Sequence, residues 1–164
     1  MAPLSTETSV KAKVHNQLGF DEGEALEVLE PGQGVVRATG GGLEAAGADS
    51  PTKKVVREQR NPGGRGIEDD ESPLEKTYAA GANVETLGFQ SHDQARALVA
   101  YADVDGDGTD DTYQEGMDVG WNADGYLEVV SGGEPSDAIG FIAQEDDVTL
   151  GSTDDPTHVR VEFY

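Results

Sequence analysis

The sequence contains no cysteine, which excludes disulfide bonds, thiolate metal sites and a cysteine nucleophile. It also lacks any run approaching the ~18–20 apolar residues that a membrane-spanning helix requires. Its first residues show no basic cap followed by an apolar stretch, so we expect no secretory signal. These absences predict a soluble protein that is made in a cytoplasm and folds without covalent cross-links.

Positive charge is scarce. Eleven Lys and Arg stand against 33 Asp and Glu, which gives a formal net charge of −22 over 164 residues. This charge repels phosphate backbones and anionic lipid headgroups, so we expect neither a nucleic-acid partner nor a membrane partner. Few Lys, many acidic residues and few bulky aliphatics are typical of proteins that work in multimolar salt, where the Debye length is ~3 Å. We expect a halophilic source, with an ordinary acidic protein as the alternative.

The signatures of common enzyme classes are absent as well. The sequence has no Gly-x-x-x-x-Gly-Lys phosphate loop, no Gly-x-Gly-x-x-Gly opening a helix, no Gly-x-Ser-x-Gly elbow and no His-Glu-x-x-His. His15, His92 and His158 lie far apart, with no spacing that suggests shared metal ligation. We therefore expect a non-enzymatic protein without a required cofactor. An enzyme with carboxylate chemistry stays open, because a single acid/base pair cannot be recognised among 33 carboxylates.

What the sequence does contain is a series of short runs with β-branched or alternating residues, separated by Gly, Pro, Asp and Asn. The expected strands are 9–14, 25–29, 35–38, 53–57, 83–89, 96–102, 126–130, 138–143 and 158–163. In the last run Val159, Val161 and Phe163 alternate with polar residues, so these apolar side chains share one face. The pattern predicts a mainly β fold, a small antiparallel barrel or sandwich with long loops and at most short helical turns.

Turn signals divide the chain further. The segment 122–125, Asn-Ala-Asp-Gly, predicts a tight hairpin, because Asp-Gly supplies positive φ values. A Gly-rich stretch at 40–52 and another at 61–66 are expected to be mobile connections, and 72–75, Ser-Pro-Leu-Glu, predicts one helical turn. The length fits one compact unit, with an N-terminal β-rich segment or arm (1–52) and a β domain (53–164).

An acidic loop is the first candidate site. Oxygen-bearing residues at every second position can converge on a hard cation such as Ca²⁺ or Mg²⁺, while Gly108 permits a sharp turn. The second half of a calcium-binding EF loop is missing, because Gln114 stands where a bidentate Glu should be. An ordinary solvated turn is therefore the alternative. The candidate ligands are Asp103, Asp105, Asp107, the carbonyl of Thr109, and Asp111.

A basic strip is the second candidate site. Five of the eleven positive charges fall within thirteen residues, and Arg forms bidentate pairs with carboxylates that tolerate desolvation. The strip predicts a contact surface for an acidic partner. The alternative is a set of internal salt bridges to the acidic shell of the protein itself. The residues are Lys53, Lys54, Arg57, Arg60 and Arg65.

Residues 53–164 contain, in this order, the segments Val55-Val-Arg-Glu58, Gly63-Gly-Arg-Gly66-Ile-Glu-Asp, Tyr78-Ala-Ala-Gly81-Ala-Asn-Val84, Arg96-Ala-Leu-Val-Ala-Tyr101, Val119-Gly-Trp-Asn-Ala-Asp-Gly-Tyr-Leu127, Ala138-Ile-Gly-Phe-Ile-Ala143 and Val159-Arg-Val-Glu-Phe163. This order resembles the capsid decoration, or head-stabilising, proteins of tailed viruses. No single segment is specific; the resemblance lies in their order and spacing. The resemblance also favours a strand at 96–102. The alternative is a helix over 95–102, because Ser91-His-Asp-Gln94 looks like a capping box.

The resemblance implies a small β domain that docks as an oligomer, often a trimer, on the outer surface of an assembled capsid, with the major capsid protein as partner and no catalysis. With the acidic composition it suggests a virus of a halophilic archaeon. The chain departs from the pattern by the insertion at 103–115 and by Glu71-Ser-Pro-Leu-Glu75, which is added ahead of Tyr78, so the family does not vouch for a cation site in the inserted loop. The rival interpretation is a halophilic extracellular adhesion or carbohydrate-binding β module with a calcium loop.

Overall fold

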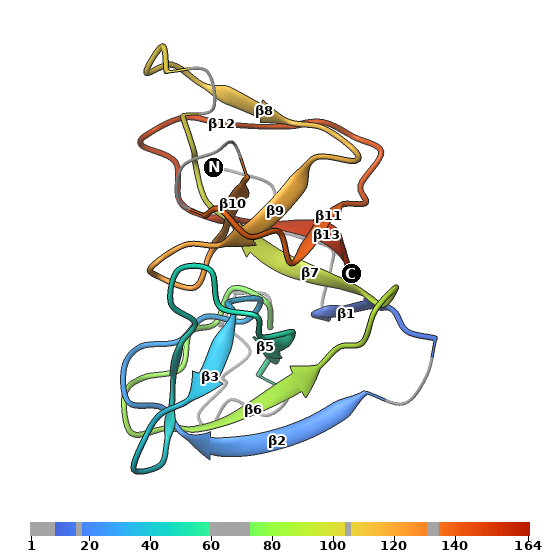
Figure 1. Cartoon of the computed structure of the whole chain (residues 1–164). Coiled ribbons are helices and arrows are strands. Elements are labelled where there is room, and N and C mark those ends of the chain that lie inside the picture. The colour runs from blue at the N-terminus through green and yellow to red at the C-terminus, as the bar shows by residue number, and fades with distance from the viewer. Residues whose placement is uncertain (1–8, 16–17, 60–72, 104–105, 131–134) are drawn as a thin grey trace, which may run out of the picture.

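The computed structural model describes residues 9–15, 18–59, 73–103, 106–130 and 135–164 (Figure 1). These residues form thirteen β-strands and no helix, so the mainly β fold class is confirmed. Accordingly, none of them belongs to a helix long and apolar enough to cross a membrane. The strands are β1 (Lys11–Lys13), β2 (Gly19–Glu24), β3 (Val35–Arg37), β4 (Leu43–Ala45), β5 (Lys54–Val56), β6 (Asn83–Gly88), β7 (Gln94–Val99), β8 (Asp111–Tyr113), β9 (Asp118–Trp121), β10 (Leu127–Val129), β11 (Gly140–Ile142), β12 (Val148–Leu150) and β13 (Thr157–Phe163).

Five of these strands close into a barrel in the order β7-β10-β9-β11-β13, with β13 returning to β7. The longest pairing joins β13 to β7, antiparallel from Thr157↔Val99 to Glu162↔Gln94. The seam between β7 and β10 is parallel and consists of the single pair Leu127↔Val99. β1 adds to β7 outside the ring. The barrel alternative of the predicted fold is therefore the observed one.

The interior of the barrel follows from strand alternation. Val159, Val161 and Phe163 of β13 are buried as predicted, while the polar residues between them are half-buried. They join a cluster of twenty buried residues whose largest members include Trp121 and Tyr113. The hairpin predicted at 122–125 connects β9 to β10. Only Gly125 has a positive φ, 74°, so the glycine alone supplies the left-handed residue of that turn.

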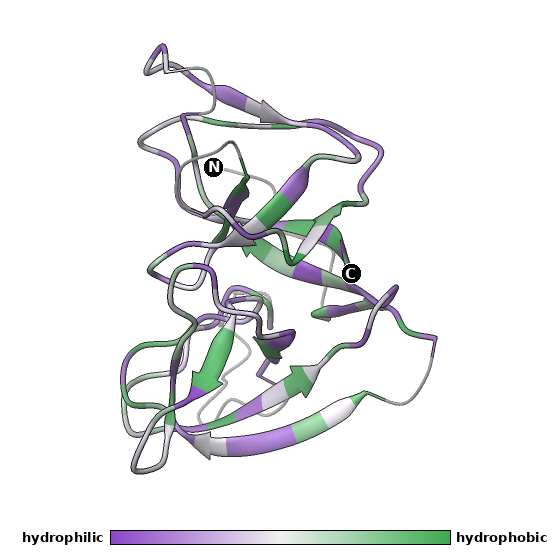
Figure 2. Cartoon of the chain, in the orientation of Figure 1, coloured by the Kyte–Doolittle hydropathy of each residue, from purple (hydrophilic) through white to green (hydrophobic). Residues whose placement is uncertain are grey.

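A second region lies beside the barrel and consists of the three-stranded sheet β2-β6-β5 with the β3–β4 hairpin; we call it the sheet region (Figure 1). It has its own, smaller cluster of buried residues, which includes Leu29, Leu43 and Tyr78. Much of β2 is hydrophilic in Figure 2, as is β8, whereas β3 and the barrel strands carry hydrophobic segments. The segment 29–34 connects the two regions: Gly32 N donates to Val56 O at 2.9 Å, and Gly32 O accepts from Leu98 N at 2.9 Å.

Several local predictions were wrong. The run 25–29 forms only isolated bridges at Ala25 and Leu29, and the connection at 40–52 contains β4. The predicted helical turn at 72–75 is a hydrogen-bonded turn over 73–75, while Ser72 lies outside the described residues. The strand preferred at 96–102 is confirmed as β7. Five strands, β2, β4, β8, β9 and β12, were not predicted as separate elements. β2, Gly-Phe-Asp-Glu-Gly-Glu, carries little intrinsic strand preference, whereas β12, Val-Thr-Leu, is a strand-favouring run of only three residues.

Candidate functional site

The two lysines of the basic strip lie at the start of β5, on the surface of the sheet region. Lys54 Nζ pairs with Asp21 Oδ2 at 2.9 Å, and both side chains are about one third exposed. Lys53 Nζ donates to Ser91 Oγ at 3.2 Å and also to the main-chain oxygen of Tyr164. Both amines thus have intramolecular partners and keep part of their surface in solvent.

Arg57 lies inside the protein, with its side chain only 10% exposed. Its Nη1 is 3.3 Å from Glu85 Oε2, and its Nε is 3.7 Å from Glu58 Oε1. That Nε has no hydrogen-bond partner among the described residues. The guanidinium also lies 5.9 Å from the ring centroid of Phe20, within cation–π range. Arg57 therefore compensates the buried carboxylate of Glu58 and the partly exposed carboxylate of Glu85, and its small exposed area limits what it can offer to a partner.

Glu58, the last residue of the Val-Val-Arg-Glu segment, fastens the chain that precedes β1. Its Oε2 accepts from Val10 N at 3.1 Å and its Oε1 from Ser9 Oγ at 3.4 Å. Nearby, burial followed by the charges of Glu85 and Glu58 raises the pKa of Tyr78 far above its usual range. The phenol of Tyr78 donates to the main-chain oxygen of Arg57 at 2.9 Å. This segment thus ties the N-terminal strand to the sheet region.

Arg60 and Arg65, the remaining residues of the strip, lie outside the described residues. The described part of the strip therefore presents Lys53 and Lys54 at the surface and Arg57 in the interior.

The acidic loop projects from the barrel just before β8. The carboxylate of Asp103 accepts from Gly106 N at 2.8 Å and Gly108 N at 3.1 Å. Asp107 Oδ1 accepts from Thr109 N at 2.8 Å and Thr109 Oγ1 at 2.6 Å. Two of the proposed ligands thus cap the loop backbone, and the Thr109 carbonyl accepts from Tyr101 OH at 3.0 Å.

The described acidic residues do not converge on one point in this loop. Asp111 belongs to β8, Asp105 lies outside the described residues, and no group of three or more metal-ligating side chains occurs in the described part of the chain.

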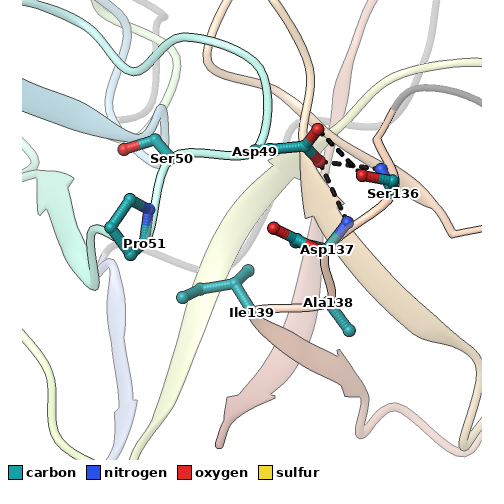
Figure 3. A pocket seen from close by; sticks show the side chains of 7 residues that line it. All are labelled: Asp49, Ser50, Pro51, Ser136, Asp137, Ala138 and Ile139. Atoms are coloured by element: carbon teal, nitrogen blue, oxygen red, sulfur yellow. Dashed lines mark hydrogen bonds between the residues drawn. The ribbon is translucent and has the colours of Figure 1, made fainter.

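A contact that the sequence did not predict lies in a hollow of about 390 Å³ between the segments 49–51 and 136–139 (Figure 3). Asp49 Oδ1 accepts from Ser136 N at 2.7 Å and Asp137 N at 3.0 Å, and Oδ2 accepts from Ser136 Oγ at 3.0 Å. These hydrogen bonds lower the pKa of Asp49, and the bond from the backbone N–H of Asp137 has the largest effect. Asp49 has a φ of 58° and lies in a turn, and its carboxylate connects two segments that are far apart in the sequence. All the groups that donate to the carboxylate of Asp49 belong to the same chain, so we interpret this contact as structural.

A second hollow, of about 410 Å³, lies where the sheet region meets the 122–125 turn. Its floor includes Gln33, which donates from Nε2 to Asp124 O at 2.7 Å. Burial, followed by the charge of Glu30, raises the pKa of Tyr126 to about 12. The acidic lining suits cations better than anions, as expected over most of a surface with this charge. Its lining residues are Glu27, Val28, Gln33, Glu44, Ala45, Ala123, Asp124 and Tyr126.

The seven segments that carry the resemblance are divided in the fold: 55–58 and 78–84 lie in the sheet region, and 63–69 lies outside the described residues. Four of them supply all five barrel strands: 96–101 contains most of β7, 119–127 spans most of β9 and the start of β10, 138–143 contains β11, and 159–163 contains most of β13. The inserted segment 103–115 instead forms β8, which pairs with β12 outside the ring. No known protein-family model matches the chain, and no curated protein matches its sequence.

Proposed function

We propose that this chain is a non-enzymatic structural protein of a tailed virus of a halophilic archaeon, which binds the outer surface of the assembled capsid and stabilises it. One observation supports the proposal above others: four of the seven segments that resemble decoration proteins contribute residues to all five strands of one closed barrel. The departure from the pattern, at 103–115, lies on β8 outside that barrel. Related domains usually share a core and differ by additions at its periphery.

The proposed mechanism is binding that depends on assembly. A protein that binds only the assembled lattice stabilises that lattice by RT ln(1 + [L]/Kd) at each site. If the chain acts as a trimer, each oligomer contacts several capsid subunits, and avidity strengthens modest individual contacts. The exposed parts of Lys53 and Lys54 provide positive charge toward an acidic capsid, together with Arg60 and Arg65 of the same strip.

Quantitative mass spectrometry of virions purified in molar salt tests the proposal. We expect the chain in a fixed, high ratio to the major capsid protein, and we expect added purified protein to bind particles stripped of it. A chain absent from washed particles, or present only in trace amounts, contradicts the proposal. Soluble capsid subunits serve as the control, since an assembly-dependent binder should leave them unbound.

The calcium-binding adhesion or carbohydrate module remains the second proposal because the described residues of the acidic loop are exposed from Gly106 to Asp110. It predicts retention on a cell surface or glycan resin that depends on Ca²⁺. Virion association without such retention favours the capsid protein, whereas Ca²⁺-dependent retention without virion association favours the module.

A further inference from the structure

The outer edge of β2 is the feature from which we draw a further inference. In the sheet order β2-β6-β5, β2 pairs with β6 on one side and with no strand on the other, within the described residues. An unpaired edge of this kind presents N–H and C=O groups that can template the addition of another strand. With six residues, β2 is long for an edge strand of this protein, and it carries the exposed apolar side chain Phe20.

The backbone groups of Glu22 point away from the sheet. Glu22 is opposite Glu85 of β6, and Glu85 O accepts from Arg57 N on the far side at 2.9 Å. In an antiparallel ladder the N–H and C=O of one residue point the same way, so Glu22 and Glu85 form a non-hydrogen-bonded pair. The N–H and C=O of Glu22 therefore lie at the centre of the open edge.

Both of these groups are occupied by side chains of the same protein. Glu22 N donates to Asp21 Oδ1 at 2.9 Å, and Glu22 O accepts from Arg37 Nη2 at 3.0 Å. The same Nη2 contacts both carboxylate oxygens of Asp21 at 2.8 Å. A single ion pair between β2 and the end of β3 thus satisfies the two outward backbone groups at the centre of the edge. By the same register, the backbone groups of Phe20 and Glu24, two residues to either side, also face outward.

A glycine of β2 lies beside this ion pair. A Cβ added to Gly23 would lie 3.2 Å from Leu43 Cγ, which is tight, and 3.6 Å from Arg37 Nη1, which is ordinary contact. The absence of a side chain at Gly23 therefore leaves room for Leu43 next to the strand, and the guanidinium of Arg37 lies close by. Lys54 holds Asp21 from the other side at 2.9 Å, so the carboxylate is fixed by two cations. Hydrogen bonds from Arg37 and then Lys54 keep the pKa of Asp21 far below its usual range.

We propose that Arg37 and Asp21 close the outer edge of β2 against strand addition, and that this edge pairs with β2 of a second copy of the chain once Arg37 is removed. The occupant is a second copy because an identical edge is present on every molecule at the same concentration. Asp21, Glu22 and Glu24 add like-charge repulsion to the block. Molar salt screens that repulsion within ~3 Å, so under those conditions the side-chain caps carry most of the block.

The test is the association state of Arg37→Ala, measured by sedimentation velocity over a wide range of concentration in molar NaCl. We expect the wild type to keep one mass, whatever its native oligomer, and the variant to approach about twice that mass, as two-fold pairing requires. A melt followed by circular dichroism verifies that the variant is folded.

A second substitution identifies the edge. Proline at Glu22 removes the outward N–H without removing a β2–β6 hydrogen bond, and proline is tolerated on edge strands for this reason. Arg37→Ala combined with Glu22→Pro should therefore return to the wild-type mass. If the double variant still associates, another surface is responsible and the proposal fails.

Arg160→Ala is the matched control. Arg160 also caps a carbonyl, Ala143 O, from Nε at 3.1 Å and Nη2 at 3.0 Å. Its strand β13 is paired on both sides, with β7 and β11, so its removal opens no edge. We expect a lower melting temperature and an unchanged mass. Association of Arg160→Ala, or an unchanged mass for Arg37→Ala at every concentration, overturns the proposal.

Discussion

Different interactions stabilise the barrel and the sheet region. The cluster inside and around the barrel contains twenty buried residues, including four aromatic side chains, whereas the cluster of the sheet region contains seven, with Tyr78 as its one aromatic. Four ion pairs of Lys or Arg lie in the sheet region: Arg37–Asp21, Lys54–Asp21, Arg57–Glu58 and Arg57–Glu85. The ion pairs beside the barrel involve histidine. Apolar burial stabilises one region, and charge pairing supplements a small core in the other.

Removal of Trp121 should cause the largest loss. Its ring is fully buried, and its Nε1 donates to Thr52 O at 2.8 Å. Trp121→Ala should lower the free energy of unfolding by about 3–5 kcal/mol, as measured by denaturant titration. Trp121→Phe keeps most of the apolar contact and should lose less. A loss below about 1 kcal/mol for Trp121→Ala would show that the barrel core is not the main source of stability.

Arg57 tests the charged side of the comparison. Arg57→Met leaves the buried carboxylate of Glu58 without its cation, which should cost about 1–3 kcal/mol of unfolding free energy. We expect a lower melting temperature with unchanged occupancy on capsids. Lys53→Ala is the contrasting variant, because its partly exposed amine lies in the proposed contact strip; it should lower occupancy with little change in the melt. The opposite pattern would make Arg57 a docking residue.

His158 tests the junction between the regions. Its Nε2 lies 2.7 Å from Pro31 O. Burial lowers the pKa of the imidazole, the hydrogen bond to Pro31 and the charge of Glu75 oppose this with smaller effects, and the charge of Arg96 adds to it. Below the ordinary histidine pKa of ~6.5 the unfolded chain takes up a proton that the folded chain resists, so stability should fall as pH decreases from there toward the lowered pKa. His158→Gln should flatten this slope in melts at several pH values. Equal slopes for both proteins would remove His158 from the junction.

The smallest effect is expected at the acidic loop. If Ca²⁺ or Mg²⁺ binds there, a concentration equal to its Kd adds only about 0.4 kcal/mol of stability. Calorimetry in high monovalent salt should then show heat for the wild type and none for Asp107→Asn. Heat that the substitution leaves unchanged would assign the cation to another part of the acidic surface.

The sequence was informative where structure is determined locally. The alternation in β13 and the Asp-Gly turn at 124–125 are properties of neighbouring residues, and both were predicted. The strand β2, Gly-Phe-Asp-Glu-Gly-Glu, has little β preference of its own and exists because it pairs with β6 more than sixty residues away. A barrel or sandwich was predicted from the order of the segments that resemble decoration proteins, not from any single segment.

For the candidate sites, the sequence predicted which residue types occur together but not where their side chains lie. The clustering of Lys53, Lys54 and Arg57 is visible in the sequence, but the burial of Arg57 depends on the pairing of β5 with β6. Asp49 joins residues 87 positions apart, and no local signal distinguishes it from the other acidic residues. In a chain with 33 carboxylates, those that make structural contacts can be recognised only when their donors are known.

The order of strands around the barrel has a consequence for how the protein is made. β13 lies between β7 and β11, and the other edge of β7 meets β10 through a single parallel pair. A ribosome therefore makes β7, β9, β10 and β11 before the strand that completes the ring exists. Until β13 has been made, β7 and β11 lack the partner that joins them. Ring closure is a late, non-local step, because β13 pairs with β7, a strand made much earlier in the chain.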